Sequence, residues 1–102
     1  MFDAIKNLFT PVDYSELMKR KAIIIDVRSR GEFQSGHIEG SINCPVDELE
    51  KHLSKLKDKD QPIITCCASG MRSGMAKRTL VAKGYKEVYN GGGWSGLNGK
   101  VK

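Results

Sequence analysis

Two apolar runs rich in β-branched residues stand out along the chain. One covers residues 22–27 (AIIIDV) and the other residues 62–66 (PIITC). Continuous runs of this kind are typical of strands that are buried on both faces of a sheet. Residues 87–89 (EVY) predict a third, shorter strand. The glycines at 91–93 predict a loop after it, because glycine permits unusual backbone dihedral angles.

Amphipathic stretches with helical spacing lie between and before these runs. A spacing that resembles a capping box predicts a helix over 13–20. Leucines that share one face predict a second helix over 46–57, capped by Asp47. A third helix is predicted over 73–83, where Gly84 can end it in the left-handed conformation.

The order of these elements predicts the fold class. Strands that alternate with helices in short steps indicate right-handed crossovers and a mainly parallel sheet, so the fold is α/β. Ligands of such sheets bind beyond the carboxyl ends of the strands. The strand over 62–66 ends at Cys67, which is where chemistry is expected.

The length of 102 residues is that of one domain, which we place at 10–102. Residues 1–9 form an N-terminal extension, in which apolar positions at helical spacing predict a short amphipathic helix. This helix is either a packing appendage or a helix that docks on a partner or a membrane surface.

The charge balance bears on the kind of ligand. Lys and Arg number 17 against 12 Asp and Glu, a net charge of +5. The basic residues are dispersed, and nucleic-acid binding needs a concentrated basic patch, so no nucleic acid is expected as a partner. A small anionic substrate suits the balance better.

Cysteine content and hydropathy bear on the compartment. Three cysteines are too few for a disulfide scaffold. No apolar stretch approaches the roughly 20 residues of a membrane span, and the first residues lack the features of a signal peptide. We therefore expect a cytoplasmic protein without membrane contact. The histidines and cysteines lack zinc-ligand spacing, so we expect no metal and no cofactor.

The segment 67–73 (CASGMRS) joins the end of an apolar strand to the start of a helix. A loop at this place turns its backbone N–H groups inward and forms an anion-binding nest. Such N–H groups lower the pKa of a thiol from its usual value of about 8.5, and the thiolate is the nucleophile. Cys67 is therefore a candidate nucleophile, against the alternative of a buried cysteine that only packs.

Other reactive side chains have structural interpretations. Asp26, Arg28 and Glu32 are expected to form an ion-pair and hydrogen-bond frame beneath the loop, because a carboxylate at a strand end needs a partner. Cys66 and Cys44 are either core residues or resolving thiols.

Three ordered signatures resemble those of the single-domain rhodaneses, which are sulfurtransferases. The likeness covers about residues 10–98. It is carried by the loop Cys67-x-x-Gly70-x-Arg72-Ser73, by an N-terminal signature (IDVR at 25–28, EF at 32–33, GHI at 36–38, GSIN at 40–43 and Pro45) and by a closing signature (GY at 84–85, VY at 88–89 and GGW at 92–94).

This resemblance implies three layers, with a mainly parallel central sheet of about five strands and helices on both faces. It implies transfer of sulfane sulfur from thiosulfate or a persulfide donor to a thiol or cyanide, through a persulfide on Cys67. A sulfur-relay protein is a further candidate partner. His37 would position the loop that follows Gly36. The residues implied to hold the anionic substrate are Ala68, Ser69, Gly70, Met71, Arg72 and Ser73.

The doubled cysteine permits a second register. Counted from Cys66, the spacing to Arg72 is that of cysteine-dependent phosphatases, some of which share the rhodanese fold. Counted from Cys67, the loop has the shorter sulfurtransferase length, which we favour. A third hypothesis is a non-catalytic binding or regulatory module. The sequence also leaves open whether Arg72 attracts the donor or braces the loop.

Overall fold

A computed structural model describes residues 11–102 of the chain, so the helix expected over 2–9 lies outside the described residues. One sheet organises this part of the chain, with strand order β2-β1-β3-β4 and every pair parallel. Its strands are β1 (Ile23–Asp26), β2 (Ile42–Asn43), β3 (Ile63–Cys67) and β4 (Val88–Gly93). The α/β class and the parallel sheet are confirmed. Within 11–102 the sheet has four strands, one fewer than expected, and it ends at the two-residue edge strand β2.

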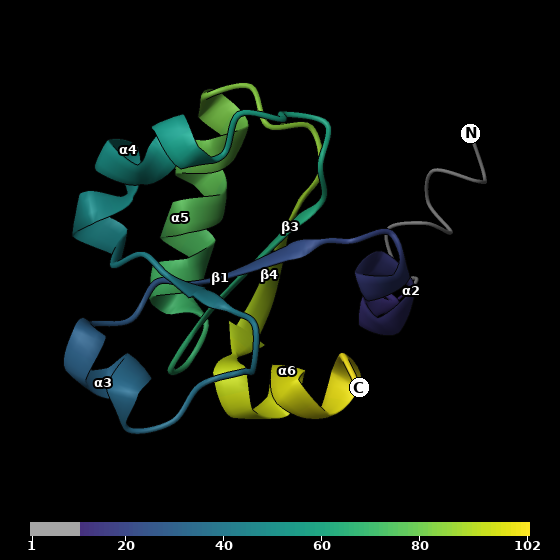
Figure 1. The fold of residues 1–102 in the computed structure, drawn as a ribbon, viewed down its shortest axis with the longest axis vertical. Helices are drawn as coiled ribbons and strands as arrows, with labels where there is room; N and C mark the ends of the chain where they lie inside the picture. Colours follow the sequence, from purple (N-terminus) through teal and green to yellow (C-terminus); the bar gives the residue numbers. More distant parts are fainter. Residues whose placement is uncertain (1–10) are drawn as a thin grey trace.

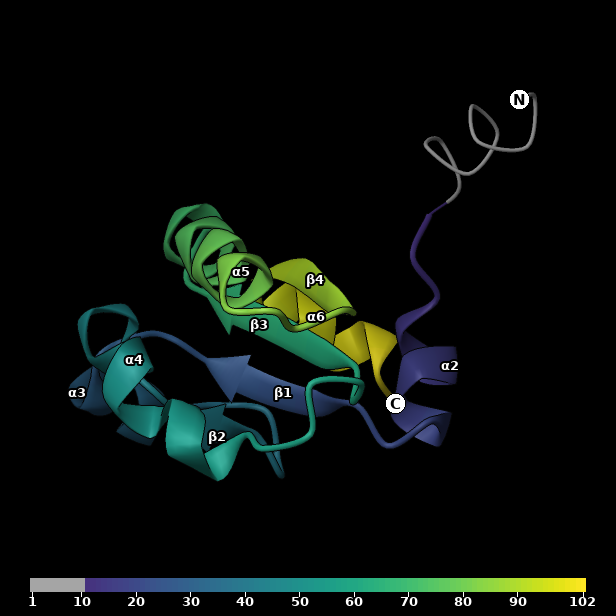
Figure 2. The same ribbon diagram turned by 90° about the horizontal axis from the view of Figure 1, so that it is seen from above.

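Helices cover both faces of this sheet (Figures 1 and 2). Helices α4 and α5 lie on one side, and α2 and α6 lie on the other, while α3 lies near the carboxyl end of β1. The bounds are α2 (Tyr14–Lys19), α3 (Arg30–Gln34), α4 (Leu49–His52), α5 (Met71–Ala82) and α6 (Trp94–Lys100); 3-10 turns at Val46–Glu48 and Leu53–Lys55 flank α4.

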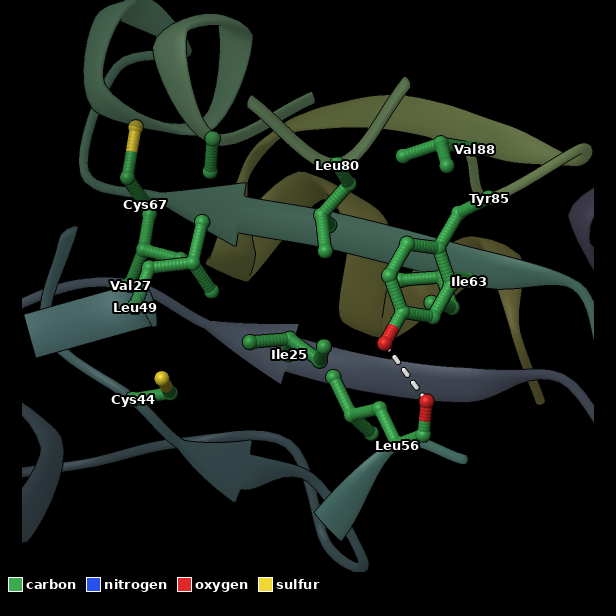
Figure 3. Close-up of a cluster of buried hydrophobic side chains, with 11 residues drawn as sticks. Ile25, Val27, Cys44, Leu49, Leu56, Ile63, Cys67, Leu80, Tyr85 and Val88 are labelled. Carbon is green, nitrogen blue, oxygen red and sulfur yellow. Dashed lines mark hydrogen bonds between the residues drawn. The ribbon is translucent and has the colours of Figure 1, made fainter. Parts of the chain in front are cut away.

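The alternation of side chains along the strands divides the interior into two clusters. Ile25, Ile63 and Cys67 pack with Leu49 and Leu80 under α4 and α5, as Figure 3 shows. The cluster on the other face is covered by α2 and α6 and contains Leu17, Ala22, Ile24, Ile38, Ile64, Cys66 and Leu97. The adjacent residues Cys66 and Cys67 therefore belong to opposite faces of the sheet.

Two predicted helix ends are confirmed and one is wrong. The Asp13 side chain accepts the N–H of Glu16 at 3.0 Å and caps α2. Gly84 follows α5 with φ +96°, the left-handed conformation that the sequence predicts. The helix over 46–57 is instead split into a 3-10 turn, α4 and a second 3-10 turn. Asp47 lies inside the first of these turns, so it does not precede the free N–H groups that a capping side chain must reach.

The loop predicted at 91–93 is also wrong, because these glycines belong to β4. They permit close packing: a Cβ on Gly91 would lie 2.7 Å from Leu97 Cδ2 and 2.9 Å from Ile64 Cγ2. Helix α6 begins directly afterwards at Trp94, where the sequence predicts no element. The glycine run thus lets β4 pack closely against both β3 and α6.

We predict that Gly91→Ala lowers the free energy of unfolding by about 1–3 kcal/mol, because the new methyl group overpacks a closed contact. Gly99→Ala is the matched control, since a Cβ at Gly99 in α6 meets nothing within 4 Å. In a helix this control should raise the free energy of unfolding by up to about 1 kcal/mol. Urea denaturation of both variants measures the difference. Equal stabilities would contradict the packing described for β4.

Candidate active site

The candidate site lies at the carboxyl edge of the sheet, where β3 passes into α5. A register shift between Thr65 and Cys67 ends the regular ladder with β4 and pairs Cys67 with Gly93. Gly70 then adopts φ +102° at the first position before α5. Only glycine takes this conformation readily, so Gly70 allows the chain to curl back over Cys67. We call the segment Cys67–Ser73 the reactive loop.

The Cys67 sulfur faces hydrogen-bond donors from the reactive loop. The Gly70 N–H donates to Sγ at 2.9 Å, and Ser73 Oγ lies 3.4 Å from the same sulfur. In Figure 3 the sulfur points away from Val27 and Leu49, toward the loop and the start of α5. The N–H groups are turned inward as expected. The residue is also enclosed, with only 1% of its surface exposed.

These donors change the acidity of the thiol. Burial raises the pKa of Cys67 and is the largest single effect. The Ser73 hydroxyl and the N–H groups of Ser73, Gly70 and Ser69 together outweigh it, so the pKa is lowered. Hydrogen bonds to a charged group favour that charge, and here they favour the thiolate.

The two other cysteines behave in the opposite way. Burial, followed by the charge of Asp26, raises the pKa of Cys66 to about 12. Burial, followed by the charge of Glu48, raises the pKa of Cys44 to about 11. All three cysteines are free thiols. Cys67 is therefore the thiol whose surroundings favour the nucleophilic form.

Arg72 joins the reactive loop to α3. Its guanidinium donates to both carboxylate oxygens of Glu32, at 2.8 and 2.9 Å. Hydrogen bonds from Arg72 and from Ser29 lower the pKa of Glu32 to about 2. Glu32 and Ser29 also form a capping box at the start of α3. This geometry gives Arg72 a bracing role, and a cavity of about 370 Å³ opens beside it, lined by Val27, Ser29, Arg30, Pro45, Val46, Asp47 and Glu48.

Asp26 and Arg28 form a buried ion pair at the end of β1. Arg28 Nε lies 2.9 Å from Asp26 Oδ1, and Arg28 Nη2 lies 2.7 Å from Oδ2. The same guanidinium donates to the carbonyl groups of Glu32 and Gly36, and it lies 4.7 Å from the centre of the Trp94 ring. Arg28 thus holds the middle of α3 at Glu32 and the turn after α3 at Gly36, and α3 carries the partner of Arg72.

The side chains of the remaining expected site residues point away from the sulfur or lie on other elements. His37 is exposed, stacks on Phe33 and places Nδ1 2.8 Å from the Phe33 carbonyl oxygen, so its hydrogen bond holds α3 and not the reactive loop. Ala68, Ser69 and Met71 turn their side chains to solvent, and Met71 is 79% exposed. They contribute backbone and rim to the site.

Asn90 on β4 is a site residue that the sequence analysis missed. Its Oδ1 accepts the Ser73 hydroxyl at 2.6 Å and the Gly92 N–H at 3.0 Å, and its Nδ2 donates to the Gly70 carbonyl at 3.1 Å. The available signal was positional: Asn90 follows the run at 87–89, close to the carboxyl end of a strand in the expected parallel sheet.

No group of three His, Cys, Asp or Glu side chains within 11–102 is placed to hold a metal ion. In the same residues, no helix combines the length and the apolar character that crossing a membrane requires.

Known proteins resemble this chain in sequence and in the arrangement of its elements. Residues 10–100 match the family model described as rhodanese-like domain. The uncharacterized protein YqhL of Bacillus subtilis is 40% identical over 84 residues, which are 81% of this chain and 66% of YqhL. The putative sulfur carrier protein YrkF of the same organism is 42% identical over 67 residues, 66% of this chain and 36% of YrkF.

The thiosulfate sulfurtransferase PspE of Escherichia coli is 37% identical over 70 residues, 68% of this chain and 67% of PspE. A solved structure described as a rhodanese with anions from E. coli superposes with a TM-score of 0.69 at 35% identity, covering 72% of this chain and 88% of that one. The chain thus spans about two thirds of YqhL and little more than a third of YrkF.

We predict that iodoacetamide labels Cys67 faster than Cys66 or Cys44 near neutral pH, by roughly tenfold or more, because the thiolate is the reacting form. Peptide mass spectrometry of the alkylated native protein locates the label. Cys67→Ser should remove the fast phase, and Cys44→Ser should leave it unchanged. A fast phase that survives in Cys67→Ser would contradict the acidity assigned to Cys67.

Arg28→Met should lower the free energy of unfolding by about 3–5 kcal/mol, because it leaves the Asp26 carboxylate buried and unpaired. Arg20→Met is the control: Arg20 pairs with Glu87 at the surface, where such a pair contributes at most about 1 kcal/mol. Thermal unfolding of both variants measures the contrast. Similar losses in the two variants would show that the buried pair has no special role.

Proposed function

Because this chain belongs to the rhodanese-like domain family, we propose that it is a sulfurtransferase that carries sulfane sulfur as a persulfide on Cys67. The observation that carries the proposal is the contrast among the three thiols. Hydrogen bonds of the reactive loop lower the pKa of Cys67, whereas burial raises the pKa of Cys66 and Cys44. The name of PspE, a thiosulfate sulfurtransferase, supports the same reaction class.

The reaction proceeds in two displacements at sulfur. The Cys67 thiolate attacks the outer sulfur of thiosulfate, so a new S–S bond forms at Cys67 while the S–S bond of the donor breaks. Sulfite leaves with the electron pair of the broken bond. An acceptor thiolate or cyanide then attacks the outer sulfur of the Cys67 persulfide. The products are an acceptor persulfide or thiocyanate, and the Cys67 thiolate is regenerated.

The inward N–H groups have a defined task in this scheme. The Gly70 N–H lies 2.9 Å from the sulfur and stabilises negative charge before the attack and after the transfer. Sulfite is a good leaving group, so the scheme needs no separate acid. The exposed side chains of Ala68, Ser69 and Met71 are uncharged and Arg72 is engaged by Glu32. Persulfides are therefore donors as suitable as thiosulfate.

Donor and acceptor would approach through the cavity beside Arg72, which has room for a small anionic molecule or the thiol of a peptide. Its rim carries the guanidinium of Arg30, which is largely exposed. A sulfur-relay protein is a proposed partner, and the similarity to the putative sulfur carrier protein YrkF supports it.

The placement of Cys66 supports this register over the phosphatase register. The Cys66 side chain shares one face of the sheet with Ile24 and Ile64, where it packs in the cluster that contains Leu97 of α6, away from the reactive loop. A phosphatase nucleophile must instead lie within the loop that binds the phosphate oxygens. The hydrogen-bond donors around the Cys67 sulfur also support a catalytic role over a non-catalytic binding module.

We expect mass spectrometry to find one added sulfur on the wild-type protein after exposure to thiosulfate or a small persulfide. Cys67→Ser should abolish the added mass and the cyanide-dependent release of thiocyanate. Cys66→Ser should retain both, because Cys66 faces the other side of the sheet.

The same variants should be assayed with p-nitrophenyl phosphate. Turnover that depends on Cys66 would establish the phosphatase register. A wild-type protein that gains no sulfur from any sulfane donor and turns over no phosphate would favour the binding module.

A further inference from the structure

We propose that Asn90 is a positioning residue for sulfur transfer, which holds the Ser73 oxygen and the reactive loop beside the Cys67 sulfur. This proposal rests on the proposed function, because it concerns the same thiol. Asn90 lies on β4, outside the reactive loop, and its side chain contacts the loop at two points.

The contacts of Asn90 fix the orientation of its amide. Nδ2 is a donor and faces the carbonyl oxygen of Gly70 at 3.1 Å, and Oδ1 is an acceptor and faces the N–H of Gly92 at 3.0 Å. Exchanging the two atoms would set a donor against a donor and an acceptor against an acceptor. A Cβ on Gly74 would lie 3.2 Å from Nδ2, so α5 also packs closely against the amide. Asn90 is thus held in one orientation.

Holding the Gly70 carbonyl affects the sulfur through the backbone of Gly70. The N–H of the same residue donates to Cys67 Sγ at 2.9 Å. Gly70 has φ +102°, and the Cβ position on Gly70 lies 3.5 Å from Gly92 Cα, so the loop rests against the glycine run of β4. The carbonyl and the N–H of Gly70 belong to two successive peptide groups that meet at its Cα. Together with the Gly74 N–H, which donates to the same carbonyl at 3.0 Å, Asn90 restrains the Gly70 backbone from which the N–H reaches the sulfur.

The second contact concerns the single proton of the Ser73 hydroxyl. This hydroxyl is fully buried and has two neighbours that accept a hydrogen bond, Asn90 Oδ1 at 2.6 Å and the Cys67 sulfur at 3.4 Å. While Cys67 is a thiol, its S–H donates to Ser73 Oγ and the hydroxyl donates to Asn90. When Cys67 is a thiolate, the hydroxyl turns to the sulfur.

When the hydroxyl turns to the sulfur, Asn90 Oδ1 is not left unpaired. Asn90 Oδ1 keeps the N–H of Gly92 when the Ser73 proton leaves it. The Ser73 hydroxyl can therefore change its acceptor from Asn90 Oδ1 to the sulfur with little loss of free energy. Ser73 itself is held in place because its carbonyl accepts the Thr65 hydroxyl at 2.9 Å.

The charged side chains near the sulfur are paired with one another, whereas the hydrogen bonds of Asn90 and Ser73 are made by neutral groups. Arg72 on α5 interacts with Cys67, and Glu32 on α3 pairs with Arg72. Asp26 on β1 interacts with Cys66 and pairs with Arg28. Asn90, the side chain from β4, is uncharged. A negative charge introduced at position 90 would oppose the thiolate and repel the Gly70 carbonyl.

The test is the pH dependence of Cys67 alkylation by iodoacetamide, measured without any sulfur donor. Asn90→Asp should raise the pKa of the Cys67 thiol and slow alkylation below that pKa by about tenfold. Asn98→Asp is the matched control: it makes the same change of charge on α6 and should leave the profile unchanged. An unchanged profile in a folded Asn90→Asp protein overturns the proposal.

A second variant tests the anchor without a new charge. In Ser73→Ala the contact of Asn90 with the serine hydroxyl is already gone, so adding Asn90→Leu removes the contacts of Asn90 with Gly70 and Gly92. This second change should slow alkylation about threefold further. If adding Asn90→Leu does not change the alkylation profile of Ser73→Ala, the role of Asn90 in holding the Gly70 backbone is contradicted.

Because the alkylation profile needs no sulfur transfer, the two proposals fail separately. If the wild-type protein forms no persulfide but the Asn90 variants shift the alkylation profile as predicted, only the proposed function is contradicted. If the wild-type protein forms a persulfide but the Asn90 variants have the wild-type alkylation profile, only the role proposed for Asn90 is contradicted.

Discussion

The alternation of side chains along β3 is the constraint on which the site depends. Successive residues of a strand point to opposite faces, so two adjacent cysteines cannot share one environment. Cys66 enters the cluster under α2 and α6, where burial raises its pKa to about 12. Cys67 faces the start of α5, where hydrogen bonds lower its pKa against the effect of burial. A shift of one residue in register would exchange the two thiols.

The rest of the molecule holds the reactive loop against that thiol. On one side, Arg72 pairs with Glu32, and α3 is itself fixed by the buried guanidinium of Arg28. On the other side, the loop meets the glycine run of β4, where a Cβ on Gly93 would lie 3.0 Å from the Ala68 carbonyl oxygen. Charged pairs and close backbone contact thus act together, and both are needed because the loop has few buried side chains of its own.

Local signals predicted the central strands, the reactive loop and the end of α5, since each depends on residues that are near in sequence. The order of the elements predicted the parallel sheet. The missed elements are short: α3 has five residues, and its sequence signal was the capping box of Ser29 and Glu32. Strand β2 has two residues and exists through its pairing with β1. The strand at 91–93 and the contacts of Asn90 depend on β4 lying beside β3, which is a nonlocal arrangement.

Burial of Cys67 is compatible with a sulfur carrier, although it limits direct access to the thiol. An S–S bond is about 2.05 Å long, so a persulfide places its outer sulfur that much farther from Cys67. The outer sulfur, and not the buried one, is the atom that an acceptor must reach. The inner sulfur stays among the N–H groups of the loop, which stabilise it as the leaving thiolate. In the proposed persulfide, an enclosed Cys67 would therefore keep water from the reacting bond and place the carried sulfur farther from the core.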